Sequence, residues 1–380
     1  MKSIGIGIVG AGHISGAHAA AVQKAQGVEL TAVCDPDLQR ARALAESHGN
    51  PKVFASLAEM LACNDVAAVI IATPNHLHPV QAIDCAKAGR HVLCEKPIAN
   101  SLAEAKAAEE AVSSRNLVFR SGFNQRFLAQ VKLAKLAIER GVIGEIHGFR
   151  SVFSGKWDNY FDGSNFRFDP SLSGGTTIND NLIHRYDMVR HLLSDEFTSV
   201  VADLIHSVIP PVVDDNVNLI VTTSRGARGT FSADRYSPVI ADSTELYGTR
   251  GSIHVVTNAV SPFHAVPLAI FTTLPAEEIP AELRDALFPQ ARARKIPGWS
   301  GWMSFWPQLN DAYADQVQEF GSAIQGSATG CIGATGIDGV RATELIQAAY
   351  TSHIERRWVD LPLPANAVYQ VPTYSSPPEA

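Results

Sequence analysis

The sequence predicts a two-domain α/β protein. Its N-terminal part is expected to form a doubly wound parallel sheet, and its C-terminal part an α+β domain with a large, mostly antiparallel open sheet. Three observations support this. The chain has 380 residues, more than the roughly 250–300 that one hydrophobic core usually serves. Up to about residue 121, short apolar runs alternate with helical patterns; beyond it, longer β-prone runs are separated by loops. We place the domains at 1–122 and 123–380.

The N-terminal pattern is typical of a parallel sheet with helices on both faces. Apolar runs predict strands at 4–9, 28–34, 67–72, 91–94 and 117–119. Helical patterns at 37–48, 79–88 and 101–114 separate them, and a further helix is expected shortly after residue 15. The strands therefore run in one direction, with their carboxyl ends at one edge of the sheet.

The C-terminal pattern predicts strands at 146–153, 200–208, 217–223 and 243–246, with helices at 130–140 and 337–353. Between residues 256 and 307 lies a proline-rich segment that ends with Trp299, Trp302 and Trp306. These tryptophans are spaced as on one face of a helix. They are interpreted either as buried under the second domain or in a subunit interface, or as part of a lid over a ligand.

The net charge and the cysteine content limit the classes of ligand and partner that this protein is expected to bind. The formal charge is −7, and no basic cluster exceeds the one at 292–295, which argues against nucleic acid and favours a small molecule. Five dispersed cysteines without a CxxC pair predict reduced core thiols rather than a metal site. No apolar run reaches the roughly 18–20 residues that span a bilayer, so we expect a cytoplasmic protein without a membrane partner.

A glycine motif follows the first predicted strand. Gly10 and Gly12 end an apolar run and open a helix, with Ser15 where a third glycine usually stands. Backbone N–H groups at such a helix start favour an anion.

Asp35 ends the second strand, where it can accept hydrogen bonds from both hydroxyls of an adenosine ribose; the alternative is a helix N-cap beside a proline. Asp35 would repel a 2′-phosphate, so NAD is preferred over NADP, although Arg40 is near in sequence.

Two further strand ends carry polar residues that we expect at the cofactor, because ligands gather at the carboxyl ends of parallel strands. One end carries Thr73, Asn75 and His78, and the other carries Glu95, Lys96 and Pro97. Pro97 allows a cis Lys96–Pro97 bond that would direct the lysine into the cleft.

A glycine-opened helical segment in the second domain carries Asp180 and His184. They are four residues apart and so share one helix face. An aspartate near an imidazole stabilises the imidazolium that forms when histidine removes a hydroxyl proton. The alternative is a surface ion pair of small energy.

In this order, the motifs V-G-A-G, C-D-P, T-P-N with His78, E-K-P, G-F-N-Q-R-F, and G-G with D-x-x-x-H resemble those of the Gfo/Idh/MocA oxidoreductases. The resemblance covers most of the chain apart from roughly 256–310. It implies an N-terminal Rossmann domain that binds NAD and a second domain whose open sheet mediates homodimers or homotetramers. Leu182 stands where the family often has glycine.

The resemblance also implies site residues. Lys96, Asp180 and His184 match the catalytic lysine, aspartate and histidine. The positions that match the family's cofactor-lining residues, with Lys96 beside them, are Gly10, Gly12, His13, Ile14, Asp35, Thr73, Asn75, His78 and Glu95. Candidates for substrate binding, for each of which packing or a surface hydrogen bond is an alternative, are Arg126, Trp157, Asn159, Tyr160, Arg167, Asp187 and Tyr236.

The expected reaction is oxidation of a secondary alcohol on a polyol, sugar or sugar derivative, with hydride transfer to nicotinamide. His184 accepts the hydroxyl proton, Asp180 orients it, and Lys96 stabilises negative charge on the oxygen. Two alternatives remain. A glycosidase that uses NAD transiently would share all of these motifs, whereas a non-catalytic NAD-binding regulator would share the Rossmann part but should lack one or more of Lys96, Asp180 and His184. A metal site built on His76 and His78 is a weaker alternative, because nothing else has metal-ligand spacing.

Overall fold

The computed structural model describes residues 3–156, 166–207, 214–238, 240–258, 266–281, 283, 302–327, 332–372 and 374. They divide into two compact units. The first comprises Met1–Phe127, Ser171–Gly174 and Asp311–Thr343, and the second comprises Leu128–Pro170, Gly175–Asn310 and Glu344–Ala380. The chain therefore returns to the first unit twice after leaving it.

The described residues of the first unit form a six-stranded parallel sheet in the order β3-β2-β1-β4-β5-β6. Its strands are β1 (Ile4–Val9), β2 (Val28–Cys34), β3 (Lys52–Phe54), β4 (Ala68–Ile71), β5 (His91–Cys94) and β6 (Phe119–Ser121). The order reverses between β1 and β4, and the crevice at such a point is where doubly wound sheets bind ligands. Ile8 and Ile70 on one face of the sheet, and Val69 and Val92 on the other, are fully buried, so the central strands are apolar on both faces, as parallel strands require.

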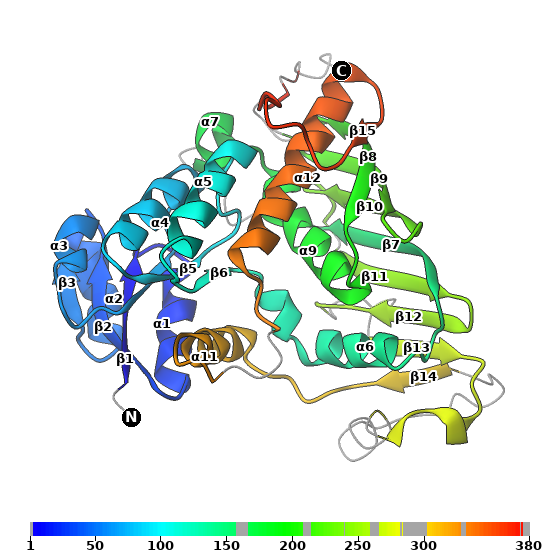
Figure 1. Cartoon of the computed structure of the whole chain (residues 1–380), viewed down its shortest axis with the longest axis horizontal. Helices are drawn as coiled ribbons and strands as arrows, with labels where there is room; N and C mark the ends of the chain where they lie inside the picture. Colours follow the sequence, from blue (N-terminus) through cyan, green and yellow to red (C-terminus); the bar gives the residue numbers. More distant parts are fainter. Residues whose placement is uncertain are drawn as a thin grey trace. The chain divides into compact units, whose positions relative to one another are not determined.

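The helices of this unit fall into two groups (Figure 1). α1 packs against α2 and α11, and α4 packs against α5. Right-handed crossovers on either side of the reversal place the groups on opposite faces of the sheet. Their bounds are α1 (Ser15–Lys24), α2 (Leu38–Ser47), α3 (Leu57–Leu61), η1 (Asn75–Leu77), α4 (His78–Lys87), α5 (Leu102–Ser113), η2 (Asn124–Phe127) and α11 (Ala312–Ile324).

The described part of the second unit forms a nine-stranded sheet in the order β14-β13-β12-β11-β7-β10-β9-β8-β15. Only the β7–β10 pair among these strands is parallel. The strands are β7 (Ile146–Ser154), β8 (Phe197–Ile205), β9 (Asn216–Thr223), β10 (Arg228–Asp234), β11 (Ala241–Gly248), β12 (Gly251–Val255), β13 (Leu268–Thr272), β14 (Trp302–Phe305) and β15 (Val359–Asp360). The expected mostly antiparallel sheet is confirmed.

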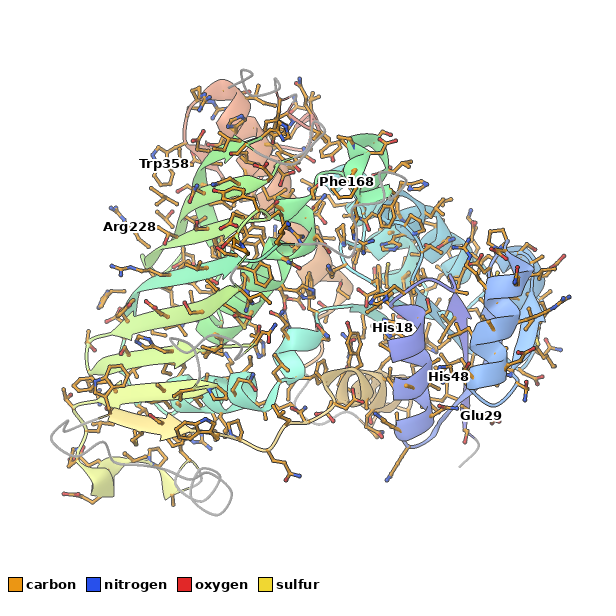
Figure 2. The ribbon with its side chains drawn as sticks, turned by 180° about the vertical axis from the view of Figure 1, so that it is seen from behind. His18, Glu29, His48, Phe168, Arg228 and Trp358 are labelled. Atoms are coloured by element: carbon orange, nitrogen blue, oxygen red, sulfur yellow. The ribbon has the colours of Figure 1, made fainter. Side chains whose placement is uncertain are left out.

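Helices cover one face of this sheet. α6 (Ala129–Glu139) and α9 (Leu182–Leu193) lie against it (Figure 1). Tyr186 of α9 meets Phe231 of β10 edge to face, with ring centroids 4.8 Å apart, and this contact fixes α9 on the sheet. Arg228 and Trp358 extend from the other face (Figure 2). The remaining helices are η4 (Phe166–Phe168), α7 (Pro170–Ser173), α8 (Thr177–Asp180), η6 (Ala276–Glu278) and α12 (Gly336–Glu355).

The tryptophan segment corrects one prediction. Trp302 lies in strand β14, which pairs antiparallel with β13, so the helical-face interpretation is wrong at this position. A spacing of three and four residues fixes a helix only when the backbone can complete its own hydrogen bonds, whereas here the edge of β13 supplies them. Trp299 lies outside the described residues. No helix in the described part of the chain has the length and apolar character needed to cross a membrane.

Candidate active site

The turn between β1 and α1 is held in one conformation. Gly10 has a φ of +93°, and a Cβ atom added there would lie 2.6 Å from the carbonyl oxygen of Ala72, so a side chain does not fit. The buried Ser15 hydroxyl donates to the carbonyl oxygen of Gly10 at 2.7 Å and ties α1 to the turn. A Cβ atom added at Gly12 would meet no described atom within 4 Å. The turn thus leaves open space beside a helix N-terminus, which suits a phosphate group.

Asp35 lies at the end of β2 and is 6% exposed. Its Oδ2 accepts the N–H of Ala11 at 2.8 Å, and its Oδ1 accepts the N–H of Asp37 at 2.8 Å. An ionised carboxylate offers about four acceptor positions, so each oxygen retains capacity for a hydroxyl. The N-cap of α2 is Asp37, which accepts the N–H groups of Gln39 and Arg40. The N-cap alternative therefore belongs to Asp37 rather than Asp35.

His78 braces the loops after β4 and β5. Its Nδ1 lies 2.7 Å from the carbonyl oxygen of Pro97, and its Nε2 lies 2.7 Å from the carbonyl oxygen of Thr73. Burial lowers the pKa of His78, although the contacts with these two carbonyl oxygens oppose the shift. Because both of its ring nitrogens contact backbone carbonyl oxygens, His78 fixes the relative positions of the two loops. The Thr73 hydroxyl donates to Oε1 of Gln81 at 2.7 Å.

Glu95 connects helix α1 to the loop that carries Lys96. Its Oε1 lies 2.7 Å from Nε2 of His18, which is fully buried on α1 (Figure 2). Its Oε2 accepts the backbone N–H of Lys96 at 3.2 Å. The Lys96 side chain is partly exposed, and the Lys96–Pro97 bond is cis. The position of Lys96 is thus set from the same helix whose N-terminus opens the glycine turn.

Asp180 and His184 lie on two consecutive short helices. Asp180 ends α8, and His184 is in the first turn of α9. Asn181 between them has dihedral angles of −95° and −39°, and the N–H of His184 donates to the carbonyl oxygen of Asn181 at 3.2 Å. The segment therefore divides into two helices at this point, where the sequence predicted that both residues share one helix. Leu182 is fully buried as the first residue of α9. It contributes to the core of the second unit.

Two basic residues approach the carboxylate of Asp180. Nη2 of Arg235 donates to Oδ2 of Asp180 at 3.0 Å, and Nε of Arg167 lies 3.7 Å from the same oxygen. Arg167 was a predicted substrate-binding residue, but Arg235 was not. The signal for Arg235 in the sequence is its position next to the predicted Tyr236.

Asp214 is a second residue that the sequence did not reveal. Its carboxylate accepts the N–H groups of Thr176 and Ile178, each at 2.8 Å, and thereby caps the start of α8. Burial raises the pKa of Asp214 to about 6, although these N–H groups and Arg235 oppose the shift. Nothing local in the sequence links residue 214 to residues 176–178.

The other predicted residues have varied surroundings. Arg126 contacts Oδ1 of Asp338 at 3.1 Å and the carbonyl of Ile332 at 3.4 Å, within the first unit. Nδ2 of Asn75 donates to the carbonyl of Ser173 at 2.9 Å. The Tyr236 hydroxyl accepts a hydrogen bond from Asn216 at 2.7 Å. His13 is exposed, Ile14 is the N-cap of α1, and Asp187 is buried. Trp157, Asn159 and Tyr160 lie outside the described residues.

Comparison with known families assigns both parts of the chain. Residues 4–123 match the oxidoreductase family with an NAD-binding Rossmann fold, and residues 131–254 match the GFO/IDH/MocA C-terminal domain. The chain belongs to the GFO/IDH/MocA oxidoreductase family. The predicted resemblance is confirmed, and with it the expectation of an NAD-dependent oxidoreductase.

Relatives within the GFO/IDH/MocA family cover most of the chain. It is 32% identical to levoglucosan dehydrogenase of Pseudarthrobacter phenanthrenivorans over 67% of this chain and 73% of that protein. It is 29% identical to inositol 2-dehydrogenase of Rhizobium meliloti over 94% and 99%. A solved levoglucosan dehydrogenase in complex with NADH has a TM-score of 0.80 at 25% identity, covering 95% of this chain and all of that one.

The residues of the GFO/IDH/MocA Rossmann domain fit NAD. The open space at Gly12 would take the pyrophosphate, and the remaining acceptor capacity of Asp35 would take the ribose hydroxyls. Nδ1 of His76, in the loop after β4, is buried and has no hydrogen-bond partner among the described residues, as expected for a group that meets a ligand. Among the described residues, no cluster of three His, Cys, Asp or Glu side chains could hold a metal ion.

Proposed function

We propose that this protein is an NAD-dependent dehydrogenase that oxidises a secondary alcohol of a cyclic polyol, a pyranose or a related sugar derivative. One observation carries the proposal: both GFO/IDH/MocA domains are matched in a chain that retains Lys96, Asp180 and His184 together. The relatives named above act, by their names, on levoglucosan and inositol, which are ring compounds rich in secondary hydroxyls. A regulator that had lost catalysis would have no need for all three side chains.

The proposed chemistry divides among these residues. NAD, when bound, supplies the hydride acceptor. An imidazole nitrogen of His184 takes the hydroxyl proton, so that the alcohol loses a proton and a hydride and becomes a ketone. Asp180 orients the imidazole and stabilises its protonated form. The Lys96 ammonium stabilises the negative charge that develops on the substrate oxygen.

The remaining site assignments belong to the same proposal. We assign cofactor binding to Gly10, Gly12, His13, Ile14, Asp35, Thr73, Asn75, Glu95 and Lys96, with His78 acting through the backbone that it braces. Arg167 is the substrate-binding candidate with the strongest support, since it is partly exposed and lies beside Asp180. Arg126, Trp157 and Tyr236 complete the proposed set.

Domain roles, assembly and location follow as proposals. Residues 1–122 are assigned to NAD binding and residues 123–380 to substrate binding and oligomerisation, apart from 171–174 and 311–343, which belong to the first unit. The sheet face that carries Arg228 and Trp358 (Figure 2) is where a homodimer or homotetramer would form. Four of the cysteines are described and are free thiols, which supports a reducing, cytoplasmic location.

The test is a spectroscopic panel. Purified protein and NAD are mixed with inositols, pyranoses, anhydrosugars and sugar acids, and absorbance is followed at the reduced-nicotinamide band. Steady growth of NADH with at least one alcohol supports the dehydrogenase. Cleavage of a glycoside without net NADH would select the glycosidase that uses NAD transiently. NAD binding without turnover of either kind, across the whole panel, would select a regulator.

A further inference from the structure

The strand pair β9–β10 supports α8 at both ends. Asn216 at the start of β9 pairs with Asp234 at the end of β10, so the flanking residues Asp214 and Arg235 lie at the same end of this hairpin. The N–H of Arg235 also donates to the carbonyl of Asp215 at 3.0 Å. Asp214 caps the start of α8, and Arg235 binds Asp180 at its end. The four-residue helix is therefore held by one rigid frame.

Arg235 is a permanent cation in this frame. It is 1% exposed, and burial lowers its pKa to about 10 while the nearby Asp180 opposes that shift. A pKa of about 10 leaves the guanidinium charged at neutral pH. A buried cation is stable only when it is paired, and Asp180 supplies a carboxylate oxygen at 3.0 Å. Arg167, whose side chain is 29% exposed, lies farther from the same oxygen at 3.7 Å.

This pairing determines what Asp180 can do for His184. A guanidinium at hydrogen-bond distance favours the ionised carboxylate, so Asp180 can orient an imidazole without taking its proton. The same positive charge offsets part of the negative charge that would raise the basicity of His184. Among the described residues, Arg167 and Asp214 also face α8, and the negative charge of Asp214 adds to burial in raising the pKa of Tyr186 and Tyr350.

We infer that Arg235 is a positioning residue of the catalytic centre, which holds Asp180 ionised and in place and thereby sets the basicity of His184. This inference rests on the catalytic roles of Asp180 and His184 proposed above. Arg235 itself touches neither substrate nor cofactor in this scheme. Its effect passes through the carboxylate of Asp180.

The test is Arg235→Met in the full chain, which removes the charge and keeps a side chain of similar length. We expect kcat to fall by on the order of tenfold, the factor that corresponds to 1.4 kcal/mol, with KM for NAD nearly unchanged. Loss of the cation should raise the pKa of His184 by about one unit, so the acidic limb of the kcat/KM profile moves to higher pH. Carbon-13 NMR of labelled histidine measures the same pKa directly, with the His184 signal assigned through His184→Asn.

Two further variants make the result decisive. Arg235→Gln keeps a donor toward Asp180 without the charge and gives the same NMR measurement if the methionine variant does not fold. Arg190→Met is the matched control: it removes a bidentate ion pair with Glu196 about 9 Å further along α9, and should leave the His184 pKa in place. If Arg235→Met and Arg235→Gln lower only stability, with kcat and the His184 pKa as in the wild type, the inference is overturned. Absence of any NADH formation by the wild type would instead overturn the proposed function, while the NMR titration still decides the coupling.

Discussion

The buried carboxylate of Asp214 gives this protein a pH dependence of stability whose sign can be worked out. Its pKa is raised from 3.8 to about 6 in the folded state, whereas in the unfolded chain it returns to its ordinary value. Between these two pH values the folded state binds the proton more tightly than the unfolded state. The free energy of unfolding contributed by Asp214 is therefore greatest at low pH and falls as pH rises toward 6.

The magnitude follows from the shift. A raise of about two pKa units corresponds to about 3 kcal/mol in total, of which roughly 2 kcal/mol is lost between pH 4 and pH 7 because the unfolded residue is partly protonated at pH 4. Asp214→Asn removes this titration. The difference in free energy of unfolding between wild type and variant should therefore shrink by roughly 2 kcal/mol as the pH rises from 4 to 7.

Urea unfolding followed by tryptophan fluorescence measures this difference. The described tryptophans, Trp302, Trp306 and Trp358, belong to the second unit, which also contains Asp214, so the fluorescence signal reports on the unit that holds this carboxylate. Asp195→Asn is the control of opposite sign. Burial raises the pKa of Asp195, but hydrogen bonds from the Ser224 hydroxyl and from the backbone N–H groups of Glu196 and Arg225 outweigh it, and the net pKa is lowered. The difference in free energy of unfolding between wild type and Asp195→Asn should therefore stay level or increase as the pH rises from 4 to 7. A level difference for Asp214→Asn across the same range would refute the reasoning.

Three other predictions concern the active site. Gly10→Ala should weaken NAD binding by roughly tenfold or more, measured by calorimetry, because a side chain at φ +93° costs about 1–3 kcal/mol and would contact the Ala72 carbonyl; unchanged affinity would count against the turn as a cofactor site. Asp35→Ser should lower the preference for NAD over NADP in kcat/KM by about tenfold or more, since the carboxylate is lost while Arg40 remains; an unaltered ratio would contradict the ribose assignment. His184→Ala should lower kcat by roughly 10²–10⁴-fold with NAD affinity retained, and normal turnover would exclude His184 as the base.

The fold of the first unit could be predicted from the sequence because each of its strands is marked by a short continuous stretch of residues. Buried parallel strands carry continuous apolar runs, and the run at 28–34 coincides with β2. Several site residues of this unit come at or just after the end of such a run, as Asp35 follows β2 and Glu95 and Lys96 follow β5. The carboxyl ends of parallel strands meet at one edge of the sheet, so the order of residues in the chain already predicts where they gather.

The site contacts of the second unit could not be predicted because they join residues that are far apart in the sequence. The four-residue spacing of Asp180 and His184, by contrast, is local and can be read from the sequence. Arg235 meets Asp180 only because β10 ends beside the start of β9, and strand pairing of that kind is fixed by register across the sheet. The helix predicted for the tryptophan segment is wrong for a related reason. The spacing of the tryptophans fits one face of a helix, but pairing with the edge of β13 makes the chain a strand at Trp302.

The same long-range contacts account for how the four-residue helix α8 can hold the carboxylate that we propose to be catalytic. A four-residue helix contributes little stability of its own, because nucleation is unfavourable and few hydrogen bonds repay it. Its conformation must then come from outside. Asp214 binds the N–H groups at its start, and Arg235 binds the carboxylate at its end. The consequence is that the orientation of Asp180 is encoded in the hairpin between β9 and β10, so a variant that shifts this hairpin should alter turnover without touching any residue of the D-x-x-x-H motif.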